Sequence, residues 1–181
     1  MIELVQFMEA DVDRLAGWVP SLQEHLFWTA SVFEYPLPRE PFARFVREST
    51  EREDRLFFKA VQRESGEPCG HLELGAIDRR NRSLRIGRVL LAPAFRGQGL
   101  GVEMMRAALA IAFDELRMHR VELGVFDINP GAIACYERAG FRREGIRRES
   151  FKVPGAPGAS ARYWSEVTMS VLDSEWRSEA P

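Results

Sequence analysis

The glycine-rich segment from Arg96 to Gly101 is where residue types and spacing point most directly to chemistry. It follows an apolar run that predicts the end of a buried strand, Val89 to Leu91, and precedes apolar residues at helical spacing. Such a turn lets several backbone N–H groups point at one spot, and the N-terminus of the helix adds partial positive charge. The segment therefore predicts a site for a phosphate or pyrophosphate.

The neighbouring residues narrow the choice of phosphate ligand. A P-loop requires Gly-Lys-Ser/Thr, and the chain has no lysine between Lys59 and Lys152. A dinucleotide fingerprint requires a third glycine where Val102 stands, so that interpretation is weak. The pattern that remains is Arg96-x-x-Gly99-x-Gly101 after Leu91-x-Pro93, with an ordinary glycine-rich turn as the alternative.

Asn129 and Tyr136 are the second group of candidate site residues. Asn129 precedes Pro130 and predicts a helix N-cap, and Gly140 predicts the C-cap. Seven residues on a helix return to nearly the same face, so both side chains lie on one side of it. Taken separately, Asn129 is a cap and Tyr136 a half-buried aromatic.

The remaining pattern predicts the elements that must position these residues. We expect helices over 9–18, 41–50, 99–116 and 130–139, and strands over 2–7, 56–62, 69–77, 82–91, 120–126, 141–151 and 162–172. Strand, helix and strand over 82–126 form a βαβ crossover with a parallel pair, whereas the three strands from 56 to 91 are antiparallel. The fold class is therefore α+β, around a mixed and mostly antiparallel sheet.

Composition bounds the class of protein. A net charge of −2 on 181 residues gives no reason to expect nucleic acid as a partner. The chain starts without a signal-peptide pattern, and no apolar run reaches the length of a membrane span. Cys69 and Cys135 lie far apart without metal-ligand spacing, as in reduced proteins. We expect a single domain over residues 1–181, cytoplasmic, with no metal and no membrane partner.

Two irregular segments remain. The first, residues 21–42, is aromatic and ends in three prolines; it is either a loop pinned by its own rings or the wall of a substrate pocket. The second, residues 153–161, is rich in glycine and proline and predicts a mobile loop. If these segments form the wall of a substrate pocket, both lie beside the substrate that accepts the transferred group. The first segment then contributes Trp28, Phe33 and Tyr35.

These motifs, in this order, resemble the GNAT N-acetyltransferases, and within them the RimJ/RimL-like branch. The resemblance covers about residues 69–141, with Leu91-x-Pro93, Arg96-x-x-Gly99-x-Gly101 and the segment from Asn129 to Phe141. It is fainter over 169–176. It implies about seven strands flanked by about four to five helices, with the sheet splayed open between strands 82–91 and 120–126.

The resemblance also implies acetyl-CoA as cosubstrate. Its pantetheine would bond to the backbone of Val89, Leu90 and Leu91 and contact Asn129. The residues expected at its pyrophosphate are Arg96, Gly97, Gln98, Gly99, Leu100 and Gly101. Arg96 could add a charge contact or contribute backbone only.

The implied reaction is attack of a neutral amine on the acetyl thioester. A backbone N–H near Leu91 would hold the oxyanion, and Tyr136 would protonate the departing thiolate. The general base is less clear, because no Asp or Glu lies between Asp78 and Glu103 and the position where some relatives carry Glu is Gly124. Glu73 is the first candidate; the others are His71, Asp127, Ser165 and Glu166, or a water relay.

Two functions follow. The first is an acetyl-CoA-dependent N-acetyltransferase acting on a primary amine, either a small molecule or a protein N-terminus, as a monomer or homodimer. The second is a catalytically weak acetyl-CoA-binding sensor or regulatory protein. The Asn129 and Tyr136 pair favours the enzyme, and the missing carboxylate before the glycine turn favours the sensor slightly.

Overall fold

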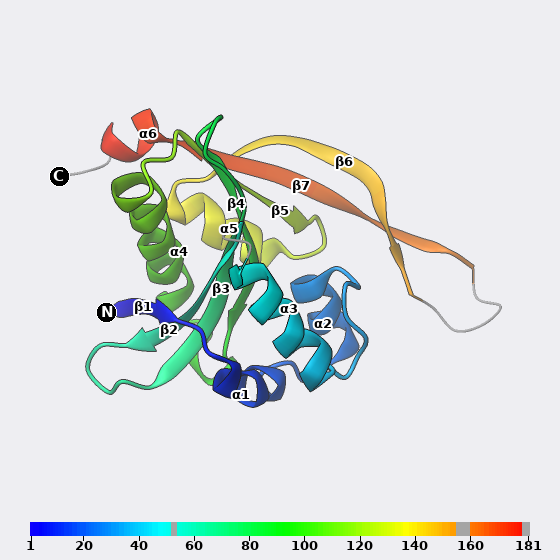
Figure 1. The fold of residues 1–181 in the computed structure, drawn as a ribbon. Coiled ribbons are helices and arrows are strands. Elements are labelled where there is room, and N and C mark those ends of the chain that lie inside the picture. The colour runs from blue at the N-terminus through cyan, green and yellow to red at the C-terminus, as the bar shows by residue number, and fades with distance from the viewer. Residues whose placement is uncertain (52–53, 155–159, 179–181) are drawn as a thin grey trace.

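The computed structural model describes residues 1–51, 54–154 and 160–178. Its centre is a seven-stranded sheet in the order β1-β2-β3-β4-β5-β7-β6 (Figure 1). The strands are β1 (Ile2–Gln6), β2 (Leu56–Gln62), β3 (Pro68–Asp78), β4 (Ser83–Leu91), β5 (Arg120–Phe126), β6 (Arg142–Val153) and β7 (Arg162–Leu172). The mixed, mostly antiparallel sheet expected from the sequence is confirmed.

The β4–β5 pair is the parallel pair of this sheet, and it is short. Ser83 pairs with Arg120 and Arg85 with Glu122, and no later residue of β4 pairs with β5. Beyond Arg85 the two strands diverge, while β4 stays paired with β3 and β5 with β7. The sheet is therefore closed at one end and open at the other between β4 and β5.

Helices cover both faces of the sheet. They are α1 (Val12–Gly17), α2 (Leu22–Thr29), α3 (Arg39–Glu51), α4 (Leu100–Ala110), α5 (Pro130–Ala139) and α6 (Asp173–Ser178), with a π-helical turn at Ile111–Glu115. Short 3-10 turns lie at Glu9–Asp11 and Pro93–Phe95. Two cores result, one under α4 and α5, which most strands enter, and the other under α1, α2 and α3, which receives Phe57 of β2 and Leu90 of β4.

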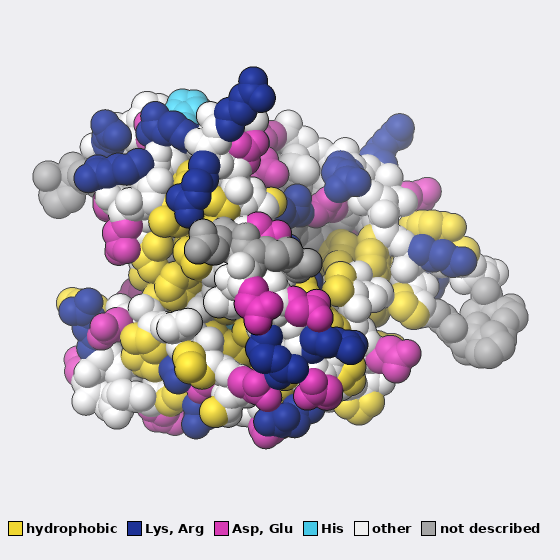
Figure 2. Space-filling view, viewed as in Figure 1, with side chains coloured by type: hydrophobic (Ala, Val, Ile, Leu, Met, Phe, Trp, Pro, Cys, Tyr) yellow, Lys and Arg dark blue, Asp and Glu magenta, His cyan; other side chains and the backbone are white. Residues whose placement is uncertain are grey.

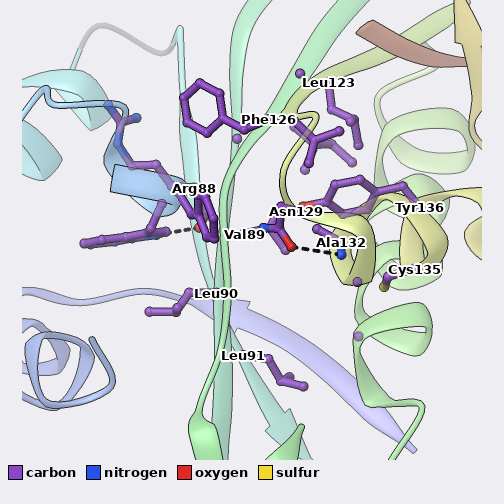
Figure 3. Close-up of a pocket in the computed structure, with 18 of the residues that line it drawn as sticks. Arg88, Val89, Leu90, Leu91, Leu123, Phe126, Asn129, Ala132, Cys135 and Tyr136 are labelled. Carbon is purple, nitrogen blue, oxygen red and sulfur yellow. Dashed lines mark hydrogen bonds between the residues drawn. The ribbon is translucent and has the colours of Figure 1, made fainter. Parts of the chain in front are cut away.

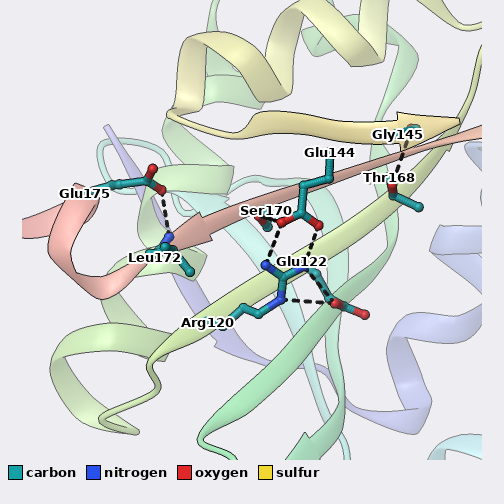
Figure 4. Close-up of polar contacts among 8 residues, drawn as sticks. All are labelled: Arg120, Glu122, Glu144, Gly145, Thr168, Ser170, Leu172 and Glu175. Carbon is teal, nitrogen blue, oxygen red and sulfur yellow. Dashed lines mark hydrogen bonds and ion pairs between the residues drawn. The ribbon is translucent and has the colours of Figure 1, made fainter.

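An ion-pair network holds the closed end together. Arg120 on β5 donates to Glu144 on β6 at 2.6 and 2.7 Å and to Glu122 at 3.3 and 3.4 Å (Figure 4). Ser170 on β7 donates to Glu144 at 2.8 Å. These bonds hold the pKa of the Glu144 carboxyl at about 2, because Arg120 and Ser170 both stabilise its ionised form.

β6 and β7 continue past the end of β5 as a two-stranded ribbon (Figure 1). Exposed side chains cover most of β6, and basic and acidic groups are interspersed over the face in Figure 2. The loop expected over 153–161 joins these strands, and its residues 155–159 lie outside the described residues. Among the described residues, no helix is long and apolar enough to cross a membrane.

Helix α2 is the largest departure from the expected elements. We expected residues 21–42 to be irregular, but Leu22–Thr29 is helical and Ala30 ends it in the left-handed conformation. Ser21 caps the helix by accepting from the N–H of Glu24 at 3.3 Å. The Ser-x-x-Glu spacing was a sequence signal for this start, but the aromatic residues obscured the helical period.

Two smaller differences concern other helices. The helix expected over 9–18 is split into a 3-10 turn and the short α1. The second is α6, which follows β7 and was not among the expected helices. The indole of Trp176 stacks on Phe113 at 6.0 Å, so packing against the π-helical turn orders this end.

Candidate active site

A cavity of about 800 Å³ occupies the gap where β4 and β5 diverge. One wall comes from β4, the glycine turn and α5, and we call it the cofactor half; Figure 3 shows Leu91, Asn129 and Tyr136 there. The other wall comes from α2, β3, β5, β7 and the part of β4 from Arg85 to Arg88, and we call it the acceptor half. Its lining residues include Phe27, Trp28, Glu73, Arg85, Arg88, Phe126 and Glu166.

A β-bulge in β4 shapes the centre of the cavity. His71 pairs with Leu90 and Glu73 with Gly87, so β4 carries one residue more than β3 between these pairs. Arg88 lies in this bulge with φ of 45°, a left-handed conformation that is unfavourable for a residue with a side chain. The bulge changes the direction of the backbone groups that follow it, and so fixes what β4 presents to the cavity.

Two side chains hold the bulge in place. The indole N–H of Trp28 on α2 donates to the carbonyl of Arg88 at 2.8 Å (Figure 3). The guanidinium of Arg88 donates to Oε1 of Glu73 at 2.5 Å and lies 4.7 Å from the ring centroid of Phe45. Together these contacts offset the backbone strain at Arg88.

The glycine turn has the form of an anion site. Gly97 and Gly99 have φ of 75° and 81°, and a Cβ on either would meet open space. Gly99 is the N-cap of α4 and provides no side-chain cap. Among the described residues, no hydrogen bond is formed by the backbone N–H groups of 97 to 101. These donors and the helix N-terminus fit a pyrophosphate.

Arg96 does not point its guanidinium freely at this turn. It donates to both carboxylate oxygens of Glu24 on α2, at 3.1 and 2.7 Å, and to the carbonyl of Leu91 at 3.1 Å. Of the two roles considered for Arg96, this arrangement favours the backbone contribution. It also ties α2 to the glycine turn.

Asn129 and Tyr136 lie on the same side of the cavity, as their spacing predicted. Asn129 caps α5 by accepting from the N–H of Ala132 at 3.2 Å (Figure 3). Tyr136 is 8% exposed, and among the described residues its hydroxyl has no hydrogen-bond partner. Burial raises the pKa of this phenol, with the neighbouring Cys135 adding to the effect, so the hydroxyl keeps its proton at neutral pH.

Besides Glu24, which is paired with Arg96, two carboxylates reach the acceptor half, and each is held by two arginines. Oε1 of Glu73 accepts from Arg55 and Arg88, both at 2.5 Å, and its Oε2 is buried without a partner among the described residues. Glu166 accepts from Arg85 at 2.6 Å and from Arg147 at 2.8 Å. Its carboxylate fills the space above Gly124, where a side chain on β5 would stand.

The structure brings most of the expected site residues to one cavity. From the sequence analysis, the lining includes Trp28, Glu73, Val89, Leu90, Leu91, Arg96, Gly97, Gly99, Gly101, Asn129, Tyr136 and Glu166. His71, another base candidate, is fully buried among aromatic rings instead, and burial lowers its pKa to about 3.

Of the residues expected to contact coenzyme or acceptor, four do not line the cavity, and neither do the base candidates Asp127 and Ser165. Phe33 packs against Phe42 at 5.3 Å, in the core under α3. Tyr35 lies on the surface beside His25, 5.5 Å away, so aromatic packing explains both better than contact with an acceptor. The side chain of Gln98 bonds to the carbonyl of Ala94, and that of Leu100 is buried in the core.

Other residues in the cavity wall were not singled out from the sequence. Glu24, Arg85, Arg88, Phe126 and Arg138 line it. Arginine at 85 and 88 alternates with apolar residues on β4, but that pattern is also typical of a strand with a solvent face. The bulge that brings Arg88 to Glu73 has no clear sequence signal.

Comparison with known proteins identifies the family. The profile of the acetyltransferase (GNAT) family matches residues 22–141. The chain is 28% identical over 171 residues to the putative ribosomal N-acetyltransferase YdaF of Bacillus subtilis, covering 93% of this chain and 90% of YdaF. It is 33% identical over 107 residues to the spermidine N(1)-acetyltransferase of Vibrio cholerae, covering 59% and 58%.

A third relative matches over a shorter stretch. The chain is 42% identical over 65 residues to the probable N-acetyltransferase YjcK of Bacillus subtilis, and so spans 36% of the length of YjcK. Among solved structures, spermidine N-acetyltransferase from Vibrio cholerae in complex with CoA and spermine has the same fold, with a TM-score of 0.83 at 22% identity. That match covers 97% of this chain and 98% of the other.

The chain belongs to the GNAT acetyltransferase family. The enzyme class expected from the sequence, an acetyl-CoA-dependent N-acetyltransferase, is confirmed. No group of three or more His, Cys, Asp and Glu side chains in the described part of the chain could hold a metal ion. Absence of a metal, like the RimJ/RimL-like branch, remains a prediction.

Proposed function

We propose that this enzyme transfers the acetyl group of acetyl-CoA to a primary amine that enters through the acceptor half of the cavity, with Tyr136 as the acid. The observation that carries the proposal is one cavity containing both the uncapped glycine turn and the free hydroxyl of Tyr136. Both features line the cofactor half, and the acceptor half of the same cavity lies beside them, which leaves an amine room to reach the thioester.

The coenzyme would lie along the cofactor half. The backbone of Val89 to Leu91 is proposed to bind pantetheine, with Asn129 beside it, and the N–H groups of 97 to 101 to bind the pyrophosphate. Arg138 on α5 also lines this wall, and we add it as a contact for a coenzyme phosphate.

Tyr136 would donate its proton to the departing sulfur. Its hydroxyl faces the cavity without a protein partner, and its raised pKa keeps it protonated. The coenzyme A thiolate in the same apolar cavity would also be poorly solvated, which raises the pKa of the thiol. Proton transfer from the Tyr136 hydroxyl to this thiolate is therefore close to balanced in free energy.

The proton of the amine has a less direct route. One oxygen of Glu73 is bound by two guanidinium groups, and the other is inaccessible. This geometry favours a role for Glu73 in positioning Arg88, although the prediction that it is the base stays untested. We propose that the amine enters unprotonated or loses its proton to water.

The finer predictions remain proposals. The match to YdaF over most of both chains supports the RimJ/RimL-like branch, because YdaF is named a ribosomal N-acetyltransferase. Other relatives are spermidine N(1)-acetyltransferases, which supports a small-molecule amine over a protein N-terminus. We also propose one domain over residues 1–181, since all seven strands form one sheet, and a monomer or homodimer.

The test is release of coenzyme A thiol from acetyl-CoA with a panel of primary amines. We expect thiol release that depends on an amine and is lost in Tyr136→Phe, while acetyl-CoA affinity measured by calorimetry is retained. Acetyl-CoA binding without turnover of any amine would instead favour the sensor or regulatory protein. No binding at all would overturn the site.

A further inference from the structure

The charges of the acceptor half are unequal. Two of its carboxylates, Glu73 and Glu166, are each bound by two arginines, and the third, Glu24, is balanced by Arg96. Four guanidinium groups therefore surround two carboxylates, and the local balance is two positive charges. A second cation entering this wall would meet repulsion and no uncommitted carboxylate among the described lining residues.

Arg85 is the arginine that an acceptor can reach. Its side chain is 39% exposed and lines the cavity, while only Nη2 bonds to Glu166, at 2.6 Å. Its other donors have no partner among the described residues. Guanidinium groups bind planar carboxylates through two parallel N–H donors, so the free part of the fork fits a second carboxylate.

The position of Arg85 suits such a contact. Arg85 and Glu122 are the last paired residues before β4 and β5 diverge, so Arg85 stands at the apex of the gap. The bulge at Arg88 lies three positions further along β4, roughly 10 Å along a strand. The guanidinium of Arg85 lies beside Gly124, two positions beyond its strand partner Glu122, so the side chain itself covers much of this distance. One small acceptor can therefore place its amine near the bulge and an anionic group on Arg85.

The opposite side of the acceptor half is aromatic. Phe27 and Phe126 line the cavity with ring centroids 6.3 Å apart. Behind them Trp164 lies 5.0 Å from Phe126 and 5.4 Å from Phe27. These rings offer a flat apolar surface for the body of an acceptor.

We propose that the acceptor is an amine carrying a carboxylate and an apolar or aromatic body, an amino-acid-like molecule, with Arg85 binding the carboxylate. The proposal rests on the N-acetyltransferase function proposed above and names its substrate class. It disfavours polyamines such as spermidine, although relatives bear that name, because the pocket has cations where a polyamine needs carboxylates.

The experiment compares phenylalanine with phenethylamine, which has the same amine and ring but no carboxylate, and includes spermidine. We expect kcat/KM for phenylalanine to exceed that for the other two by about tenfold or more, since a hydrogen bond to a charged group has this size. Arg85→Gln should remove most of the preference by lowering phenylalanine turnover, with phenethylamine changing by less than about threefold.

Three further variants control for folding and general charge effects. Arg147→Gln removes the other arginine of Glu166 from a residue outside the cavity lining, and should leave the preference within about threefold. Arg85→Lys keeps the charge without the fork and should keep part of the preference. Glu166→Gln frees Arg85, so the preference should stay or rise. Thermal melts establish that each variant is folded.

A binding measurement separates this proposal from the catalytic one. With coenzyme A present, 3-phenylpropionate should bind more tightly than 3-phenylpropanamide, and Arg85→Gln should remove the difference. If no amine is acetylated but this difference holds, the catalytic proposal fails and the carboxylate site stands. The carboxylate site is overturned if phenethylamine or spermidine is acetylated with the same kcat/KM as phenylalanine. It is also overturned if 3-phenylpropionate binds no more tightly than 3-phenylpropanamide.

Discussion

Arginine and glutamate are combined in opposite ratios at the two ends of the β4–β5 pair. At the closed end one arginine, Arg120, lies between Glu122 and Glu144. At the open end each glutamate, Glu73 or Glu166, lies between two arginines. The same residue types therefore give two different arrangements. At the closed end the guanidinium of Arg120 is shared by two carboxylates, and at the open end the arginines have more N–H donors than the two glutamates accept.

The difference separates stability from binding. At the closed end Glu144 is bonded on both oxygens and remains partly exposed, so its contribution to folding is screened. At the open end the donors of Arg85 remain available, and the backbone bulge at Arg88 is strained. Changes at the open end should therefore alter kinetics or affinity more than folding, and changes at the closed end the reverse.

Tyr136→Phe should have the largest effect, entirely at the open end. It removes only the hydroxyl, which bonds to none of the residues that the structure describes, so the free energy of unfolding should change little. Loss of a positioned acid lowers kcat by on the order of 10²–10⁴. Stopped-flow or steady-state thiol release measures this. Turnover within twofold of the unmodified enzyme would leave Tyr136 as a packed aromatic.

Gly99→Glu should come next, through the coenzyme. Gly99 has φ of 81°, and the new carboxylate would stand where the pyrophosphate is proposed. We expect the Kd for coenzyme A to rise by about tenfold to a hundredfold, as measured by calorimetry. Gly66→Glu is a matched control, because Gly66 has φ of 69°, a Cβ there also meets open space, and it lies in the β2–β3 hairpin. Equal loss of affinity in both would mean that backbone strain is the cause.

His71 should give the stability of the protein a pH dependence. Burial, with the nearby Arg88 adding to it, lowers the pKa of this imidazole to about 3, against about 6.5 in an unfolded chain. The unfolded state thus binds a proton that the folded state does not between these values, so stability falls as pH falls from 6.5 toward 3. The slope from this group approaches about 1.4 kcal/mol per pH unit.

Denaturant unfolding at several pH values tests this contribution. His71→Phe should flatten the slope between pH 6 and 4, although it also changes packing at neutral pH. His119→Gln is the control, because His119 is more than half exposed on the surface beside Asp173. An unchanged slope in His71→Phe would show that other groups set the pH dependence.

Glu144→Gln should have the smallest effect, and at the closed end. It weakens the bonds to Arg120 and removes an acceptor that is partly exposed, so the free energy of unfolding at pH 7 should fall by about 0.5–1 kcal/mol. The loss should shrink as pH falls from about 4.5 toward 2, where the native carboxyl would protonate as well. Activity that dropped more than stability would remove the proposed separation between the two ends.

The parts of the site that were predictable depend on local chemistry. Glycines with positive φ at 97 and 99, and Asn129 before a proline, are defined by neighbours in sequence, and these elements were placed correctly. Helix α2 was missed, although Ser21 and Glu24 carried its capping signal, because its aromatic residues lack a clear helical period.

The charge pattern of the acceptor half could not be predicted in the same way. Arg85 and Glu166 are 81 residues apart and meet only because β5 and β7 are neighbours in the sheet. Trp28 lines the cavity as expected, but the bond from its indole N–H to a backbone carbonyl 60 residues away had no sequence signal. Contacts of this range depend on strand order and on a bulge, neither of which has a local sequence pattern.

Helix α2 is bonded near its start through Glu24 to Arg96 and near its end through Trp28 to the carbonyl of Arg88. One element thus supports the glycine turn and the strained bulge while also forming part of the acceptor wall. Acceptor specificity and coenzyme affinity are therefore not independently adjustable traits in this enzyme. Substitutions in α2 that are selected for a new amine would therefore also change the KM for acetyl-CoA.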